Sequence, residues 1–301
     1  RALTSLEPGE TWLVEPRQVG TTEFGGTVWT PGVRWNVQPG SWFHLTECFG
    51  PVLGIMRADD LDHALQLQNA TEYGLTGGLH SLDPAEIDHW LDRVEVGNAY
   101  VNRHITGAIV QRQPFGGWKK SSIGGRAKPG GPGYLNTFGT WTVNATGSGI
   151  DTDLAVASIR RAWEMTYSVQ HDPTGLASER NILRYRPLEG VAVLVDATAS
   201  DETRNQQRAI TFAAAESSGT PIFWFDDAKE LLARMPSLPV ERLRALAPVS
   251  DDVLRAAHAA GVAVDIAPLT SDGELELTHW VKEQAVSITR HRHGRLLGNA
   301  H

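Results

Sequence analysis

The chain has 301 residues, 41% of them hydrophobic, and a formal net charge of −8. This length and composition can bury a substantial core and predict a globular protein of two domains or one large one. The acidic balance, without clustered Lys and Arg, argues against nucleic acid as a partner. A single cysteine excludes an internal disulfide and a multi-cysteine metal site, which favours a reducing cytoplasm.

Metal binding, membrane insertion and export are disfavoured by the sequence. His291 and His293 fit one solvated face of an extended segment, so we predict no metal. No run is apolar enough to span a bilayer, and residues 1–20 lack the pattern of a secretory signal. Because the segment that begins at Arg1 is expected to be ordered, we expect this chain to be a fragment of a longer protein. Any membrane association would then arise from parts outside this chain.

Residues 1–145 alternate short strands with amphipathic helices, an order that predicts α/β layering. The continuous apolar run at 52–56 is typical of a strand covered on both faces. Asp83 and Pro84 supply an N-cap and a proline at the first helical position. Strands are expected at 12–16, 31–35, 52–56, 77–81 and 99–101, and helices at 60–69 and from Pro84 to shortly before Gly97.

Residues 146–301 follow a linker-like break at 146–149 and repeat strand and helix. This repetition predicts a Rossmann-like, mostly parallel sheet. The turn after Val195 lacks the G-x-G-x-x-G pattern, so we predict no nucleotide in this domain. Strands are expected at 190–196, 220–225 and 261–266, and helices at 151–170, 201–218 and 250–260.

The stretch from Gly97 to Leu135 contains more glycine and proline than an ordinary structural segment tolerates, which predicts a site rather than a core. The turn Thr106-Gly107-Ala108 would let the backbone approach a ligand, and consecutive amides at such a turn can hold an anion. Gln113-Pro114-Phe115-Gly116-Gly117 follows. The alternative interpretation is a glycine-rich surface loop.

This stretch resembles the carboxy-terminal signature of the aldehyde dehydrogenase superfamily, and it looks most like the L-glutamate γ-semialdehyde (Δ1-pyrroline-5-carboxylate) dehydrogenases within it. Residues 106–108 and 129–132 carry the narrower match, whereas 114–117 recurs across the superfamily. The string Glu47-Cys48-Phe49-Gly50-Pro51 resembles the E-x-F-G-P element of the same superfamily. The resemblance implies a partial catalytic domain at 1–145 and an NAD-dependent oxidation of an aldehyde.

The resemblance also implies the binding residues. Glu47 would receive the nicotinamide ribose hydroxyls and Phe49 would lie near the nicotinamide, although a surface glutamate at a strand end is the alternative for Glu47. The Gly107 and Ala108 amides would anchor the α-carboxylate of L-glutamate γ-semialdehyde, the small-molecule substrate. Phe115 would pack against its aliphatic chain.

No catalytic residue is assigned within this chain. Cys48 falls at the variable position of its motif, so we interpret it as a buried packing residue and not as the nucleophile. By resemblance, the nucleophilic thiol, the acid/base glutamate and the main dinucleotide-binding sheet would precede Arg1. Arg103 and Arg112 are candidate carboxylate clamps, but the loop amides already meet that need in the family.

Two further segments bear on assembly. Residues 134–143 have the aromatic and β-branched content of a strand or flap, and the corresponding family segment crosses to another subunit, which implies a homo-oligomer. Segments at 172–187 and 286–294 resemble the extra domain of bifunctional proline-utilisation flavoenzymes. That resemblance implies an architectural second domain, and FAD only in a separate proline dehydrogenase domain outside this chain.

Three hypotheses remain open at this point. The leading one is the carboxy-terminal portion of an L-glutamate γ-semialdehyde dehydrogenase that is inactive as an isolated fragment. The second keeps the superfamily but changes the semialdehyde, and better oxidation of a carboxylate-free aldehyde by the full protein would favour it. The third is a noncatalytic assembly module, which light scattering with and without residues 134–143 would distinguish.

Overall fold

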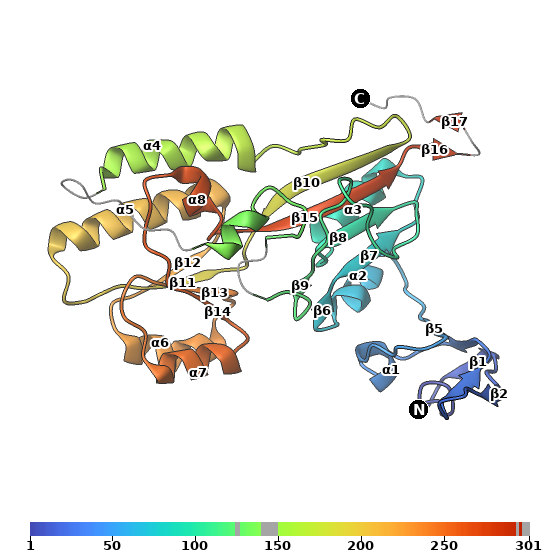
Figure 1. The fold of residues 1–301 in the computed structure, drawn as a ribbon. Helices are drawn as coiled ribbons and strands as arrows, with labels where there is room; N and C mark the ends of the chain where they lie inside the picture. Colours follow the sequence, from blue (N-terminus) through green and yellow to red (C-terminus); the bar gives the residue numbers. More distant parts are fainter. Residues whose placement is uncertain (124–126, 140–149, 293–294, 297–301) are drawn as a thin grey trace.

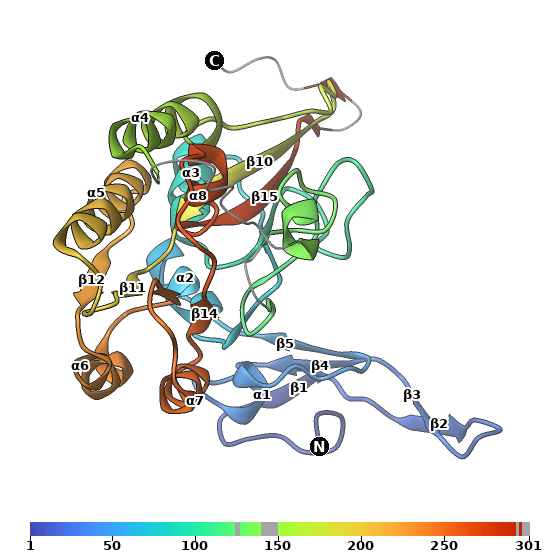
Figure 2. The same cartoon turned by 60° about the vertical axis from the view of Figure 1, so that its left-hand side comes forward.

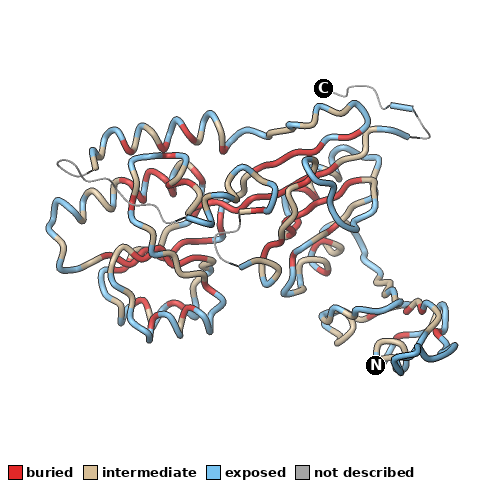
Figure 3. The backbone as a smooth tube through the Cα atoms, in the orientation of Figure 1, coloured by how far each residue is buried: buried red, intermediate tan, exposed pale blue. Residues whose placement is uncertain are grey.

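The computed structural model describes residues 1–123, 127–139, 150–292 and 295–296. Three larger sheets organise these residues: an N-terminal sheet, a central sheet and a parallel sheet (Figure 1). The predicted domain boundary near residue 145 and the linker at 146–149 lie outside the described residues. Figure 3 shows buried backbone concentrated in the central and parallel sheets, with little of it in the N-terminal sheet.

The N-terminal sheet has three strands in the order β1-β4-β5. β1 is antiparallel to β4, and β4 is parallel to β5. β5 forms the edge of this sheet and Leu53 is 59% exposed, so the expectation of a strand covered on both faces is wrong for this segment. The elements are β1 (Thr11–Val14), β2 (Gln18–Thr21), β3 (Thr27–Trp29), β4 (Gly32–Trp35), α1 (Trp42–Leu45) and β5 (Val52–Ile55).

The central sheet joins strands from both halves of the chain in the order β10-β15-β8-β7. β7, β8 and β15 run parallel, and β10 is antiparallel to β15 (Figure 1). The second half therefore completes the sheet that the first half begins. The elements are α2 (Leu61–Asn69), β6 (Tyr73–Gly74), β7 (Thr76–Leu79), α3 (Pro84–Arg93), β8 (Asn98–Val101), β9 (Trp118–Lys119), β10 (Glu179–Pro187) and β15 (Val281–Thr289).

The parallel sheet has the order β12-β11-β13-β14, which confirms the predicted Rossmann-like arrangement. Figure 2 shows α4, α5 and α8 on one side of β11, and α6 and α7 on the other. The elements are α4 (Thr152–Ala162) with the π-helical turn η2 (Trp163–Tyr167), β11 (Val191–Leu194), α5 (Asp201–Ser218), β12 (Ile222–Phe225), α6 (Ala228–Arg234), η3 (Met235–Ser237), β13 (Arg242–Ala245), α7 (Asp251–Ala259), β14 (Ala263–Asp265) and α8 (Gly273–Leu277).

β11 shows why this sheet requires an almost continuous apolar strand. Val191 and Val193 pack into the core formed with α4, α5 and α8, whereas Ala192 and Leu194 pack into the core formed with α6 and α7. Side chains alternate between the two faces of a strand, so both sets must be apolar when both faces are covered.

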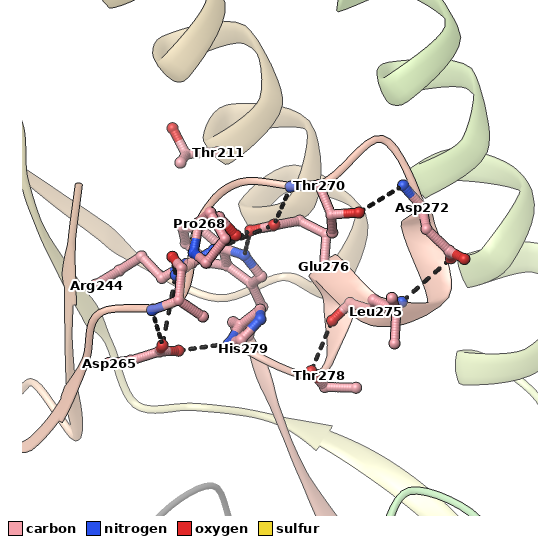
Figure 4. Close-up of polar contacts among 12 residues, drawn as sticks. Thr211, Arg244, Asp265, Pro268, Thr270, Asp272, Leu275, Glu276, Thr278 and His279 are labelled. Atoms are coloured by element: carbon pink, nitrogen blue, oxygen red, sulfur yellow. Dashed lines mark hydrogen bonds and ion pairs between the residues drawn. The ribbon is translucent and has the colours of Figure 1, made fainter. Parts of the chain in front are cut away.

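A buried ionic cluster connects β13, β14 and α8 (Figure 4). Arg244 and Glu276 have no exposed side-chain area, and Arg244 Nη2 donates to the two Glu276 carboxylate oxygens at 3.3 and 3.2 Å. Arg244 also faces Asp265, which pairs with His279. Although burial opposes ionisation, the hydrogen bond from His279 and the charge of Arg244 hold the pKa of Asp265 well below its usual range.

One predicted element has a different secondary structure from the one expected. Residues 134–138 form a 3-10 helix, η1 (Tyr134–Phe138), rather than a strand. It begins after Gly133, and the Tyr134 and Phe138 rings meet edge to face at 5.1 Å, a contact that a helical turn provides and a strand does not. Residues 140–143 of the predicted flap lie outside the described residues.

Candidate functional site

An exposed loop follows β8, and we call Thr106–Val110 the anchor loop. Gly107 has a φ of +74°, a backbone conformation that L side chains rarely adopt, which explains glycine at this position. The Tyr100 hydroxyl donates to the Gly107 carbonyl at 2.7 Å. Gly107 and Ala108 are exposed, and no described residue accepts a hydrogen bond from either amide. These two amides can therefore serve an anion.

Phe115 lies in a second loop that Asn98 holds from the start of β8. The Asn98 side chain donates to the Pro114 carbonyl at 3.1 Å and accepts from the Gly116 amide at 3.0 Å. The Phe115 amide donates to the Pro129 carbonyl at 3.2 Å, which joins this loop to the proline-rich turn that follows. Phe115 is half-buried.

Lys128 is a buried cation beneath this second loop. Its Nζ donates to the Gly116 carbonyl and to Asn98 Oδ1, and its amide donates to Glu283 Oε2 at 2.7 Å. Burial lowers the pKa of Lys128 to about 7, against the opposing charge of Glu283. Burial likewise raises the pKa of Glu283. The glycine-rich sequence gave no indication of this support from β15.

Lys128→Met is expected to remove a rise in stability with pH. A folded-state pKa near 7, below the ordinary 10.5, means that burial of the charged lysine opposes folding fully below pH 7 and progressively less as the pH rises toward 10.5. The wild-type chain should gain at most about 1.4 kcal/mol per pH unit over this window relative to Lys128→Met. Urea unfolding at a series of pH values measures the slope.

Lys229→Met on the exposed surface of α6 is the control for this series, and it should follow the wild-type profile. Identical pH dependence in Lys128→Met and the wild type would contradict a buried, titrating Lys128.

The two predicted cofactor residues lie elsewhere, in the segment between α1 and β5 that leads into the N-terminal sheet (Figure 1). Glu47 is exposed, and the Phe49 side chain is 96% exposed. Glu47 offers an exposed carboxylate that can accept from ribose hydroxyls, and Phe49 offers an exposed ring that can stack on a nicotinamide, so the chemistry of these residues fits the group that the sequence implies. Cys48 is half-buried, with its thiol 3.6 Å from the Thr46 carbonyl, so it is less enclosed than expected.

Two cavities among the described residues lie away from the five predicted binding residues. A cavity of about 680 Å³ is lined by α5 and by the segments after β13 and β14, and another of about 330 Å³ lies beside Arg103 and Arg112. None of the five residues lines either cavity. The anchor loop and the Phe115 loop both follow β8, whereas Glu47 and Phe49 lie in the connection between α1 and β5. Their binding roles stay predictions.

Arg103 and Arg112, the candidate carboxylate clamps, are both engaged by one residue. Glu179 at the start of β10 accepts from Arg103 Nη1 at 2.7 Å and from Arg112 Nη1 at 2.5 Å. Sequence reasoning missed Glu179, because nothing near it in the chain marks a partner 67 residues away.

Residues 9–142 match the aldehyde dehydrogenase family model. This segment belongs to the aldehyde dehydrogenase family. Among curated relatives of this aldehyde dehydrogenase segment, the 1-pyrroline-5-carboxylate dehydrogenase of Bacillus subtilis (strain 168) is 52% identical over 89 residues, which cover 30% of this chain and 17% of that protein. The 1-pyrroline-5-carboxylate dehydrogenase of Geobacillus sp. (strain WCH70) is 47% identical over 105 residues, which cover 35% of this chain and 20% of that protein.

A solved structure matches nearly the whole chain. Proline Utilization A (PutA) from Corynebacterium freiburgense is 44% identical with a TM-score of 0.84, over 98% of this chain and 31% of that protein. The match extends beyond the aldehyde dehydrogenase segment into the parallel sheet, and it confirms the mixed α/β fold. The chain thus spans a fifth or less of these two curated relatives and under a third of this structural one.

The described residues contain neither a metal-binding cluster nor a membrane-spanning helix. Within 1–123, 127–139, 150–292 and 295–296, no group of three His, Cys, Asp or Glu side chains could hold a metal ion. No helix in the same ranges is long and apolar enough to cross a membrane.

Proposed function

We propose that this chain is the carboxy-terminal portion of an NAD-dependent L-glutamate γ-semialdehyde dehydrogenase, which oxidises the semialdehyde to glutamate in proline catabolism. The observation that carries the proposal is the pair of exposed amides at Gly107 and Ala108, for which no described residue is an acceptor. It is supported by the 47% and 52% identity of this chain, over 105 and 89 residues, to two 1-pyrroline-5-carboxylate dehydrogenases. The proposal includes a proline dehydrogenase domain on the same polypeptide, a homo-oligomer and a cytoplasmic location.

The proposed chemistry divides between this chain and the rest of the protein. Bound NAD⁺ would supply the hydride acceptor. Glu47 would hold the ribose and Phe49 would lie against the nicotinamide, while the anchor-loop amides would hold the substrate carboxylate. Fixing one end of the semialdehyde restricts where its aldehyde carbon can lie, and this restriction lowers the entropic part of the barrier.

The proposal is tested by NADH formation with two aldehydes that differ in one group. The full-length protein should oxidise glutamate semialdehyde with a kcat/KM roughly a hundredfold above that for 4-aminobutanal, which lacks only the carboxylate, because two charge-assisted hydrogen bonds are lost. The isolated chain should form no NADH, since its one cysteine lies outside a nucleophile loop. Equal kcat/KM values would favour a different aldehyde, and turnover by the isolated chain would contradict the assignment of the nucleophile to another part of the protein.

A further inference from the structure

The anchor loop has little apolar support of its own. Ile109 and Val110 are 46% and 88% exposed, so burial contributes little to fixing the conformation of this loop. The Ile109 amide donates to Gln113 Oε1 at 2.7 Å, and the turn after the loop closes through the Arg112 and Gln113 amides on the Ile109 carbonyl. The position of the loop therefore depends on polar contacts: the hydrogen bond from the buried Tyr100 hydroxyl to the Gly107 carbonyl at 2.7 Å, and those of the side chains that flank the loop.

Those flanking side chains bind to polar residues of β10 and β15. We call Glu179, Asn181 and Ser287 the β10–β15 floor. Gln113 Nε2 donates to Asn181 Oδ1 at 2.7 Å and to Ser287 Oγ at 3.1 Å. Ser287 in turn donates to Asn181 at 2.8 Å. These three side chains are at most 4% exposed: Gln113, Asn181 and Ser287. Because water cannot reach them, each depends on the others for its hydrogen bonds.

The two arginines at the ends of the loop share a single carboxylate in this floor. The Arg103 and Glu179 side chains are 13% and 12% exposed, and Arg103 Nη1 also donates to Ser287 Oγ at 2.5 Å. Arg112 reaches the other Glu179 oxygen. Both guanidinium groups are thus paired with one carboxylate, Arg103 in a buried position and Arg112 with its side chain 39% exposed. Loss of the carboxylate charge would leave two adjacent cations without this counter-charge.

We propose that Glu179 is a positioning residue that sets the anchor loop for carboxylate-bearing aldehydes by tying Arg103 and Arg112 to the β10–β15 floor. Glu179 touches no substrate in this assignment. It holds both ends of a loop whose amides would bind the carboxylate, so it governs affinity for that group and leaves the chemistry at the aldehyde carbon unchanged. The inference rests on the proposed function.

The test is Glu179→Gln in the full-length protein, which keeps the side-chain shape and removes the charge. The KM for glutamate semialdehyde should rise on the order of tenfold with kcat within twofold of wild type, because a displaced loop costs binding of the carboxylate alone. The KM for 4-aminobutanal should stay unchanged. Glu230→Gln in the exposed Glu230–Arg234 pair of α6 is the matched control and should leave both substrates unaffected.

Each other outcome overturns the proposal. An unchanged KM for both aldehydes would show that the loop holds its conformation without Glu179. A lowered KM for glutamate semialdehyde would show that the released arginines bind the carboxylate directly. Equal losses with both aldehydes, together with a lower unfolding midpoint, would show a general structural role. If the wild-type protein fails to oxidise glutamate semialdehyde, the proposed function itself fails, which is a separate result.

Discussion

Replacing Arg244 by methionine is expected to lower the free energy of unfolding by about 3 to 5 kcal/mol, because it leaves the Glu276 carboxylate buried without its counter-charge. Glu276 has no exposed side-chain area, and its oxygens also accept from the Trp280 indole at 3.2 Å and from the Thr270 amide at 3.3 Å. The carboxylate is therefore held in place and cannot turn to solvent. Urea unfolding at neutral pH measures the loss.

A second substitution separates the loss of charge balance from the loss of packing. Arg244→Met combined with Glu276→Gln should recover part of the stability, since the glutamine keeps an acceptor for Trp280 and removes the unpaired charge. Arg255→Met in the exposed Arg255–Asp252 pair is the control, with an expected change below about 0.5 kcal/mol. If the double variant is as unstable as Arg244→Met, the buried charge is not the cause.

Gly97→Ala is expected to lower the free energy of unfolding by about 3 kcal/mol. This is the largest loss we expect from adding a single methyl group near the candidate site. A Cβ there would overlap the Gly116 carbonyl oxygen and would lie 2.7 Å from Lys128 Nζ and 2.9 Å from Gly117 Cα. Relief by a backbone shift is blocked, because the Gly97 amide donates to Gly74 and its carbonyl accepts from Ala285, both at 2.9 Å. The Phe115 loop would have to move instead.

The measurement for Gly97→Ala is again the free energy of unfolding in urea. Gly20→Ala in β2 is its matched control: a Cβ there meets no atom within 4 Å, so a change below about 0.5 kcal/mol is expected. Unfolding midpoints that are the same for the two variants would show that the loop relaxes freely around residue 97.

The sequence predicted the structure best where local signals, such as helix caps and glycines, were strong. The helix expected at 201–218 is α5 residue for residue, because Ser200 caps its start and Gly219, with a φ of +71°, ends it. The loop at 106–110 was predicted for a similar reason, since Gly107, with a φ of +74°, marks a backbone conformation rather than a distant partner.

The missed strands have polar residues at buried positions. β10 buries Asn181 and Arg184 and lacks a regular hydrophobic period. β13 alternates polar and apolar residues, but it is only four residues long and buries Arg242 and Arg244, which the alternation would place toward solvent. These side chains are tolerated because partners far along the chain satisfy them, as Gln284 does for the Arg184 guanidinium. Glu179 was missed for the same reason.

The pairing of β8 with β15 has a consequence for biosynthesis. Residues 98–101 leave the ribosome long before residues 281–289 exist, an interval of roughly 10 to 40 s at usual elongation rates. Throughout it, the nascent central sheet presents an open edge to any extended segment nearby, the geometry from which strand-to-strand aggregation begins. Slower translation of the later residues would lengthen that exposure, so chaperone demand should increase with the time taken to reach the last long strand.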